Sequence, residues 1–295
     1  MARSGWPALG VLLMAAPLLA LDVPWLLYRS HFALPRTIRG ADDRPVGALL
    51  GTVNAILGLV EWCAPRAVLC CLGAEEARYR VELFPGYHAH REPMPDELRD
   101  QWGRAGELLA SFGWSVAATE DLEADDLLGS HARVEGRAGG HTLICSADRD
   151  LYQAVDAHTA VIELRRAPPH GTIDADGVRE RSGVDPAQIP DLIALRGDPS
   201  DGIPGARGVG AKTAAALLRE HGTLEGVLGA ADTLRPRIAQ ALREQADELR
   251  TFLEVATLRP LDVRRAPDGV TDREAGGAAA AHIGMNALAR RLAAE

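Results

Sequence analysis

The sequence of 295 residues contains very little lysine and cysteine. Lys212 is the only lysine among 32 basic residues, and 41 acidic residues leave a formal net charge of −9. This charge excludes a protein that coats nucleic acid with a uniformly basic surface. It does not exclude a protein that gathers carboxylates around a metal ion.

The four cysteines are too few and too irregularly spaced for a cysteine-based framework. They stand at Cys63, Cys70, Cys71 and Cys145, and no C-x-x-C spacing occurs. A zinc site is therefore not expected. The low density also argues against a disulfide framework and favours a reducing compartment.

The apolar run near the N-terminus, Leu9 to Leu21, is too short for a membrane span. It imitates a secretory signal. The alternative is a disordered leader over 1–16 followed by a buried parallel strand, Pro17 to Asp22. We favour the strand, because cleavage near residue 20 would remove it, and we expect a cytoplasmic protein without membrane contact.

Apolar periodicity predicts an α/β architecture followed by a helical domain. Residues 46–62 have helical spacing, a buried strand is expected at 67–72, and further strands are expected at 114–118 and 141–146. Strands that alternate with helices favour a mainly parallel sheet. We place a domain boundary near 180, a helix-rich domain over 181–265 and a weakly specified tail over 266–295. The other expected helices span 96–112, 122–134, 186–196, 211–221, 223–230, 234–245 and 246–257, and residues 74–95 are expected to be irregular.

Acidic residues gather at the ends of the expected strands and helices. Taken singly, each acid is explained as a helix cap or a turn residue. Together they would repel one another unless protons or cations intervene. Oxygen ligands of this kind suit Mg²⁺ or Mn²⁺, and a pair of such ions can promote phosphodiester hydrolysis. The eight acids are Asp22, Glu123, Asp125, Asp126, Asp148, Asp150, Asp198 and Asp201.

A glycine-rich segment, Ile203 to Ala214, lies between two apolar helical stretches. It is not a phosphate-binding P-loop, because Ala211 stands where that motif needs glycine and the segment follows a helix. A helix–hairpin–helix fits better, with backbone N–H groups near Gly208 and Gly210 facing a phosphate. The alternative is a plain glycine-rich helical turn.

These motifs resemble, in order, those of the 5′-nuclease or flap endonuclease family. Glu123-Ala-Asp-Asp126 matches its E-A-D-D motif, and Ser146-Ala-Asp-Arg-Asp150 matches its T-x-D-x-D motif. The segment Gly197 to Ala214 matches the most specific motif, G-D-x-S-D-N-I-P-G-x-x-G-I-G-x-K-T-A. The resemblance covers about residues 17–265 and also includes Asp22 with Tyr28-Arg29, and Tyr87-His-Ala-His-Arg91.

The resemblance implies a PIN-like nuclease domain over 17–180 and a helix–three-turn–helix DNA-binding domain over 181–265. It implies hydrolysis of DNA at a free 5′ end or a 5′ flap with Mg²⁺ or Mn²⁺, two ions in all, held by the eight acids above. An arch that single-stranded DNA passes is implied over about 80–115. The implied phosphate-facing residues are Arg29, His88 and Arg91, and the implied DNA-binding residues are Gly205, Arg207, Gly208, Gly210, Lys212 and Thr213.

The family pattern is broken at three positions. Gly202 stands where the family has asparagine in the hairpin loop, and the other two departures lie in the implied site. Gly73 stands where the family has a metal-binding aspartate, and His88 stands where it has a lysine. Glu75 or Glu76 would be the nearest replacement carboxylate, and Gly73→Asp is expected to tighten metal binding. The alternative function is a DNA-binding homologue with impaired catalysis. A PIN-type ribonuclease and a secreted hydrolase are further alternatives. We otherwise expect a stand-alone monomeric nuclease that works beside a DNA polymerase supplied in trans.

Overall fold

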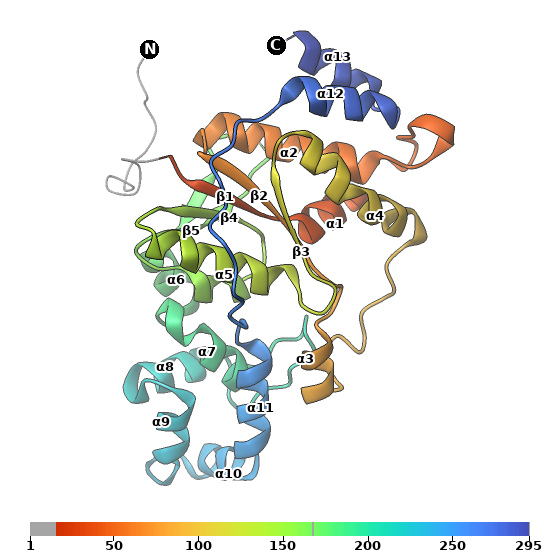
Figure 1. Cartoon of the computed structure of the whole chain (residues 1–295). Coiled ribbons are helices and arrows are strands. Elements are labelled where there is room, and N and C mark those ends of the chain that lie inside the picture. The colour runs from red at the N-terminus through yellow and green to blue at the C-terminus, as the bar shows by residue number, and fades with distance from the viewer. Residues whose placement is uncertain (1–15, 167, 295) are drawn as a thin grey trace.

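Six strands form one sheet in the order β3-β2-β1-β4-β5-β6 (Figure 1). The computed structural model describes residues 16–166 and 168–294, so the expected leader lies almost wholly outside the described residues. The first five strands are parallel, and β6 runs antiparallel to β5. The expected α/β class with a mainly parallel sheet is confirmed. The strands are β1 (Leu18–Asp22), β2 (Ala67–Leu72), β3 (Ser115–Ala118), β4 (Thr142–Cys145), β5 (Thr159–Glu163) and β6 (Gly171–Ile173).

The strand order reverses at β1, which pairs with β2 on one side and with β4 on the other. In open parallel sheets the loops diverge at such a point and leave a crevice beyond the carboxyl ends of the strands. Asp22 is the last residue of β1, so its side chain lies at this crevice.

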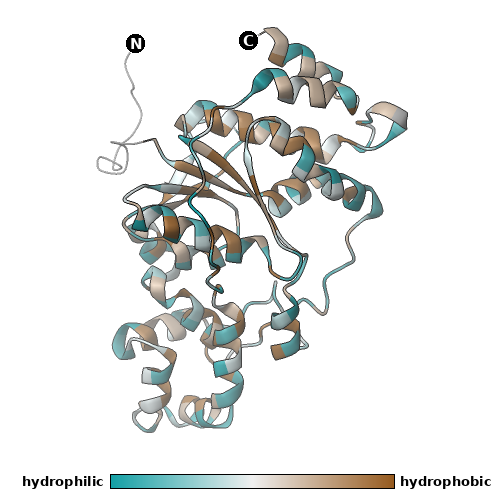
Figure 2. Ribbon diagram, viewed as in Figure 1, coloured by the Kyte–Doolittle hydropathy of each residue, from teal (hydrophilic) through white to brown (hydrophobic). Residues whose placement is uncertain are grey.

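Helices cover both faces of the sheet. Leu19 and Leu21 of β1 pack into one core with α1 (Val23–Ala33), α2 (Gly47–Cys63) and α4 (Asp96–Ser111). Leu18 and Ala20 point to the opposite core, which includes α5 (Ala124–Arg137). This alternation follows from the two-residue period of a strand. Figure 2 shows the central strands β1 and β2 as predominantly apolar.

The second core continues without a break into the C-terminal helices. Leu195, Leu218 and Phe252 from those helices belong to the same buried cluster as Leu128 of α5. The helical part is therefore fixed against the sheet domain. Its helices are α6 (Ala175–Ser182), α7 (Ile189–Arg196), α8 (Ala211–His221), α9 (Leu224–Gly229), α10 (Pro236–Glu244) and α11 (Ala246–Ala256).

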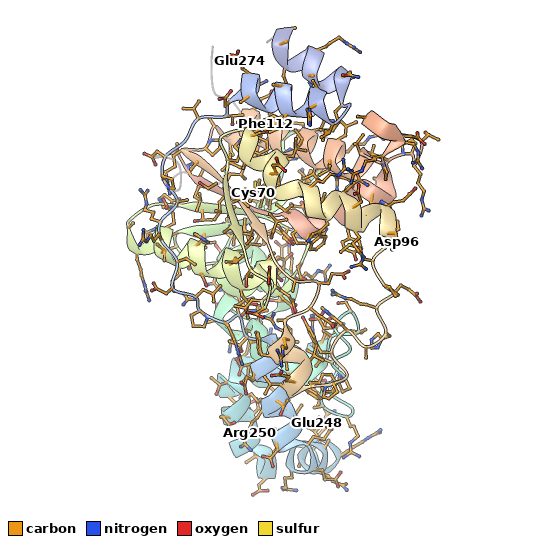
Figure 3. The ribbon with its side chains drawn as sticks, turned by 45° about the vertical axis from the view of Figure 1, so that its right-hand side comes forward. Cys70, Asp96, Phe112, Glu248, Arg250 and Glu274 are labelled. Carbon is orange, nitrogen blue, oxygen red and sulfur yellow. The ribbon has the colours of Figure 1, made fainter. Side chains whose placement is uncertain are left out.

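Residues 266–294 are not the weakly specified tail that their composition suggested. They form a strap that ends in α12 (Arg273–His282) and α13 (Asn286–Ala294). Glycine lets α12 lie directly on Phe112, because a Cβ at Gly276 would stand 2.3 Å from that ring. The Nε1 of Trp114 donates to Oγ1 of Thr271 at 2.9 Å. Figure 3 shows Phe112 beneath the two C-terminal helices.

The segment expected to form an arch is largely part of the domain body. It contains α3 (Arg78–Leu83), which the sequence did not predict, and α4, whose Leu98 and Ala105 are fully buried. The Oε1 of Gln101 accepts hydrogen bonds from the first backbone N–H groups of α2, at Ala48 and Leu49. Residues 84–95 connect α3 and α4 without a helix or strand, and the arch stays a prediction. No helix in the described ranges combines the length and the apolar character that a membrane span requires.

Candidate active site

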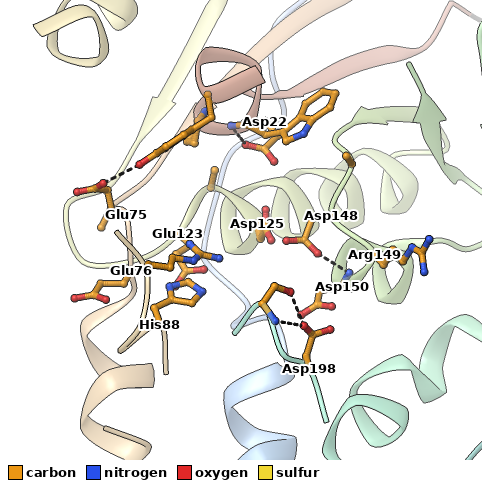
Figure 4. Close-up of a pocket in the computed structure, with 18 of the residues that line it drawn as sticks. Asp22, Glu75, Glu76, His88, Glu123, Asp125, Asp148, Arg149, Asp150 and Asp198 are labelled. Atoms are coloured by element: carbon orange, nitrogen blue, oxygen red, sulfur yellow. Dashed lines mark hydrogen bonds between the residues drawn. The ribbon is translucent and has the colours of Figure 1, made fainter. Parts of the chain in front are cut away.

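A pocket of about 970 Å³ opens beyond the carboxyl ends of β1 and β4 (Figure 4). His88 and Arg91 line it together with six of the eight acids that the sequence singled out. Asp126 and Asp201 are not among its lining residues. The six lining acids are Asp22, Glu123, Asp125, Asp148, Asp150 and Asp198.

Asp22 is fixed between two strands and the first helix. Its Oδ1 accepts a hydrogen bond from the backbone N of Trp25 at 3.0 Å, which caps the N-terminus of α1. Its Oδ2 accepts a hydrogen bond from Oγ of Ser146 at 2.6 Å, just beyond the end of β4. The carboxylate is therefore oriented before any ligand binds.

The turn after β4 presents two more carboxylates. The Oγ of Ser146 accepts from the backbone N of Asp148 at 3.1 Å. The Oδ1 of Asp148 accepts from the backbone N of Asp150 at 2.8 Å. These local bonds hold the turn in one conformation, as aspartate and serine side chains commonly do. They place both aspartates on the pocket wall.

Glu123 stands at the N-cap position of α5 and is held by the chain that precedes α3. Its Oε1 accepts from the backbone N of Ala77 at 2.7 Å. The hydroxyl of Tyr87 lies 3.1 and 3.0 Å from its two carboxylate oxygens. Asp125 follows in the first turn of α5, so both acids lie near the positive end of that helix.

Burial raises the pKa values of four of these acids above the ordinary aspartate range: Asp22, Asp125, Asp148 and Asp150. Burial brings the pKa of Asp148 to about 6. For Asp125 and Asp150 the negative charge of Asp148 raises the pKa further. Ionising the group together is therefore costly, and a bound cation would relieve that cost.

Asp198 and Asp201 come from the loop between α7 and α8. The Oδ1 of Asp198 accepts from the backbone N of Ser200 at 2.9 Å, and its Oδ2 lies 3.2 Å from Nη2 of Arg196. Asp201 instead faces His88, with 3.1 Å between its Oδ1 and the imidazole Nε2. Arg91 approaches the same oxygen at 3.5 Å.

The structure places Asp126 away from the pocket. Its side chain is fully buried, and both of its carboxylate oxygens accept hydrogen bonds from the guanidinium of Arg80 at 2.9 Å. Its Oδ1 also accepts from the backbone N of Arg259 at 2.7 Å. These bonds satisfy the carboxylate internally, so we do not retain Asp126 as a metal ligand.

The glycine-rich segment forms a loop that ends at Gly210, the N-cap residue of α8. Gly208 is exposed and has a φ of +77°, a conformation that favours glycine. A Cβ at Gly210 would meet nothing within 4 Å, which leaves room for a ligand. Gly205 has a different role, because a Cβ there would stand 2.3 Å from the backbone N of Gly197. Gly205 therefore packs against the chain rather than facing outward.

The candidate cations differ in their surroundings. Arg207 is exposed, but its guanidinium pairs with Glu244 of α10. Lys212 and Thr213 lie in the first turn of α8, and Lys212 is exposed. Arg29 is exposed on α1 and does not line the pocket.

The family comparisons match both parts of the chain. Residues 17–183 match the model of the 5′-3′ exonuclease N-terminal resolvase-like domain, and residues 184–267 match that of the 5′-3′ exonuclease C-terminal SAM fold. A 5′-3′ exonuclease of Streptomyces coelicolor is 36% identical over 299 residues, covering 92% of this chain and 97% of that protein. The chain belongs to the 5′-3′ exonuclease family. It is a nuclease.

Other relatives agree with this family. A 5′-3′ exonuclease of Mycobacterium tuberculosis is 36% identical to this exonuclease over 264 residues, with 82% of each chain covered. Among solved structures, T5 5′-exonuclease with bound zinc has a TM-score of 0.66 at 20% identity, covering 94% of this chain and 96% of that one. The catalytic core of Rad2 with DNA substrate has a TM-score of 0.60 at 16% identity, covering 94% and 93%. At these identities the two structures support the fold.

This exonuclease cannot hold an aspartate at position 73 without rearrangement. A Cβ on Gly73 would stand 2.3 Å from the backbone N of Ala124 and 2.4 Å from the carbonyl carbon of Glu123. The backbone would have to move before an aspartate at position 73 could reach the pocket, so we no longer expect Gly73→Asp to tighten metal binding. Glycine at position 73, where the family has an aspartate, lets the chain after β2 pack closely against the start of α5. Glu75 and Glu76 both line the pocket, and Oε1 of Glu75 accepts from the hydroxyl of Tyr28 at 3.1 Å.

Sequence reasoning missed Arg80 as a residue of this region. It lies in a segment expected to be irregular, and its partner Asp126 is 46 positions away. The available signal was Asp126 itself, an acid followed directly by Leu127 and Leu128 on an apolar helix face. A buried acid of this kind requires a cation, because burying an unpaired charge is costly.

Proposed function

We propose that this exonuclease hydrolyses DNA phosphodiester bonds near a free 5′ end or at a 5′ flap and requires a divalent cation. The observation that carries the proposal is the group of six acids around one pocket at the strand-order reversal. The relatives support it, since one solved neighbour binds zinc and another holds a DNA substrate.

The donor set fits a hard divalent cation such as Mg²⁺ or Mn²⁺. All six groups are carboxylates, and burial and mutual repulsion raise the pKa of several of them. In the part of the chain that the structure describes, no three acidic, histidine or cysteine side chains are already arranged to hold one ion. Cation binding would therefore bring some of these six carboxylates closer together. A pair of such ions supplies water activation and stabilisation of the leaving oxygen.

The remaining residues position the nucleic acid. His88 and Arg91 stand on the pocket wall, where a phosphate group would meet positive or hydrogen-bonding side chains. The exposed loop around Gly208 and the first turn of α8 present backbone N–H groups and Lys212 to a second stretch of backbone. Contacts of this kind fix the register of DNA without reading its sequence.

The test is cleavage of DNA labelled at the 5′ end. Nicked duplexes and 5′-flap duplexes would be incubated with pure protein in Mg²⁺, Mn²⁺ or EDTA. We expect cleavage in either metal and none in EDTA, and the product lengths distinguish exonuclease from flap activity. Asp148→Asn should reduce the rate by at least ~100-fold, since a ligand of the proposed ions is lost.

The matched control is Asp262→Asn, which makes the same chemical change at an exposed position away from the pocket. It should cleave at the rate of the unmodified protein. Full activity of Asp148→Asn, or equal activity in EDTA, would show that this pocket is not the active site. Tight DNA binding without cleavage in any metal would instead support the DNA-binding homologue with impaired catalysis.

A further inference from the structure

Arg80 and Asp126 form a buried, two-pronged ion pair next to the active site but outside the pocket. Nη1 of Arg80 donates to Oδ2 of Asp126 and Nη2 donates to Oδ1, both at 2.9 Å. The Arg80 side chain is 4% exposed and that of Asp126 is 0% exposed. Parallel bonds of this kind fix the mutual orientation of the two groups as well as their distance.

The same two side chains join three parts of the fold. Arg80 comes from α3, before the connection 84–95, and Asp126 comes from the first turn of α5. Nε of Arg80 donates to the carbonyl of Val255 in α11 at 2.9 Å. Asp126 accepts from the backbone N of Arg259 at 2.7 Å, three residues after the end of α11. The pair therefore ties the C-terminal helices to the helix that carries Glu123 and Asp125.

Arg80 also reaches the pocket through Glu123. Its Nη1 lies 3.3 Å from Oε1 of Glu123, the oxygen that also accepts from the backbone N of Ala77. One guanidinium thus contacts a carboxylate that lines the pocket and a carboxylate that does not. Burial and the neighbouring acids raise the pKa of Asp125, and the positive charge of Arg80 opposes that rise in part.

We propose that Arg80 and Asp126 are a positioning pair: Asp126 serves as the counterion of Arg80, and Arg80 orients Glu123 for the reaction. This inference rests on the proposed nuclease function only for the role of Glu123. The two oxygens of Asp126 are already bonded, so the carboxylate is not free to hold a cation. Removing Arg80 would leave Asp126 as a buried uncompensated charge, and removing Asp126 would leave Arg80 only its longer contact with Glu123. Removing both would leave neither charge buried.

The test compares five variants: Asp126→Asn, Arg80→Met, the double variant Arg80→Met/Asp126→Asn, Arg80→Lys and Asp125→Asn. Mn²⁺ binding would be measured by titration, the melting temperature by circular dichroism, and kcat and KM on a 5′-flap duplex. We expect Asp126→Asn to bind Mn²⁺ within about twofold of the unmodified protein, because Arg80 stays beside Glu123. Asp125→Asn should bind at least ~10-fold more weakly, since it loses a proposed ligand.

The double variant should melt at a higher temperature than either single variant at these two positions, because it buries no unpaired charge and the amide oxygen introduced at position 126 can still accept from the backbone N of Arg259. Both variants with methionine at position 80 should lose at least ~10-fold in kcat with little change in KM, because Glu123 loses its partner. Arg80→Lys should recover part of that loss, since it restores a cation.

Two results would overturn the proposal. If Asp126→Asn weakens Mn²⁺ binding as much as Asp125→Asn, Asp126 is a metal ligand. If the folded Arg80→Met protein keeps its full kcat, the pair has a structural role alone. Absence of both cleavage and Mn²⁺ binding in the unmodified protein would refute the proposed function instead. The melting temperatures of the double and single variants would still test the counterion role.

Discussion

The imidazole Nε2 of His88 lies 3.1 Å from Oδ1 of Asp201, and the backbone N of His88 donates to the carbonyl of Asp201 at 3.1 Å. His88 has a φ of +54°, which is uncommon for a residue other than glycine. A Cβ at Gly202 would stand 2.4 Å from the carbonyl oxygen of Gly86. These contacts fasten the connection 84–95 to the acidic loop between α7 and α8.

Replacement of His88 by lysine should extend DNA cleavage to higher pH. A lysine ammonium stays charged through the mildly alkaline range, whereas an imidazole is charged only while it is protonated. We expect His88→Lys to retain more of its maximal kcat/KM at pH 9 than the unmodified protein does. The measurement is a pH–rate profile on a 5′-flap duplex at saturating Mg²⁺. Identical profiles would show that the charge at position 88 does not act on the substrate.

Position 73 should tolerate no side chain. Gly73→Ala and Gly73→Asp both place a Cβ against the backbone of Glu123 and Ala124, so β2 and α5 must move apart. We expect a loss of about 1–3 kcal/mol in the free energy of unfolding, together with reduced cleavage because Glu123 and Asp125 lie at that end of α5. Denaturant titration and flap cleavage check both effects.

Gly103 provides the control for this substitution. It lies within α4, and a Cβ there would meet nothing within 4 Å. Gly103→Ala should leave cleavage unchanged and raise the free energy of unfolding by up to about 1 kcal/mol, since alanine favours the helix. A stable, fully active Gly73→Asp protein would show that the backbone of Gly73 does not pack tightly against Glu123 and Ala124.

The sequence predicted those elements whose limits are set locally. β2 was predicted to the residue, because an unbroken apolar run lies between Pro65 and Gly73. α8 was predicted to the residue because Gly210 and Gly222 flank its apolar pattern. By contrast, α12 is rich in alanine and glycine, and only its contact with Phe112 makes those small residues informative.

The site residues, like the elements, could be predicted from the sequence where the signal was local. Six of the eight acids line one pocket. Five of them lie at or just after the end of a strand or at the start of α5, at one edge of the sheet, and Asp198 comes from the loop between α7 and α8. Asp126 carries the same local signal, and its neighbour Asp125 does face the pocket. The two could be separated only by Arg80, which reaches Asp126 from a helix that the sequence pattern did not predict.

The acids around the pocket should make stability depend jointly on pH and divalent cations. Burial raises the pKa of Asp148 to about 6 and raises those of Asp125 and Asp150 well above the usual aspartate range. The folded protein thus keeps protons that the unfolded chain releases near pH 4, and without metal its stability falls as the pH rises through 6 and beyond. The melting temperature in EDTA should be lower at pH 8 than at pH 5.

Mg²⁺ should reverse this loss, and its effect should grow with pH. A ligand at 100 times its Kd adds about 2.7 kcal/mol to the stability of the native state, which corresponds to a rise of roughly 5 °C or more. Asp148→Asn should be less sensitive to pH in EDTA and should gain less from Mg²⁺. Melting curves at pH 5 and pH 8, with and without millimolar Mg²⁺, test whether stabilisation by Mg²⁺ grows with pH. Equal melting temperatures with Mg²⁺ and EDTA at pH 8 would count against a cation site.

The two cations of the glycine-rich loop should contribute unequally to DNA binding. The guanidinium of Arg207 pairs with Glu244, and the backbone N of Arg207 donates to Oε1 of Gln245 at 2.8 Å. Lys212 is exposed at the N-terminal end of α8 and has no ion-pair partner among the described residues. Lys212→Ala should therefore weaken DNA binding more than Arg207→Ala.

Salt dependence gives this difference a sharp readout. If the unmodified protein neutralises about four phosphates of duplex DNA, the logarithm of its binding constant falls with log salt at a slope near −3.6, and loss of one contact brings the slope about 0.9 closer to zero. Fluorescence anisotropy with Asp148→Asn as the background avoids cleavage during the titration. We expect the full change in slope for Lys212→Ala, little change in slope for Arg207→Ala, and recovery of the slope with Lys212→Arg.

The same slopes should be found on scrambled duplexes, because backbone contacts carry no sequence information. A slope change confined to Arg207→Ala would mean that the ion pair with Glu244 opens on binding and that Arg207 is the phosphate contact.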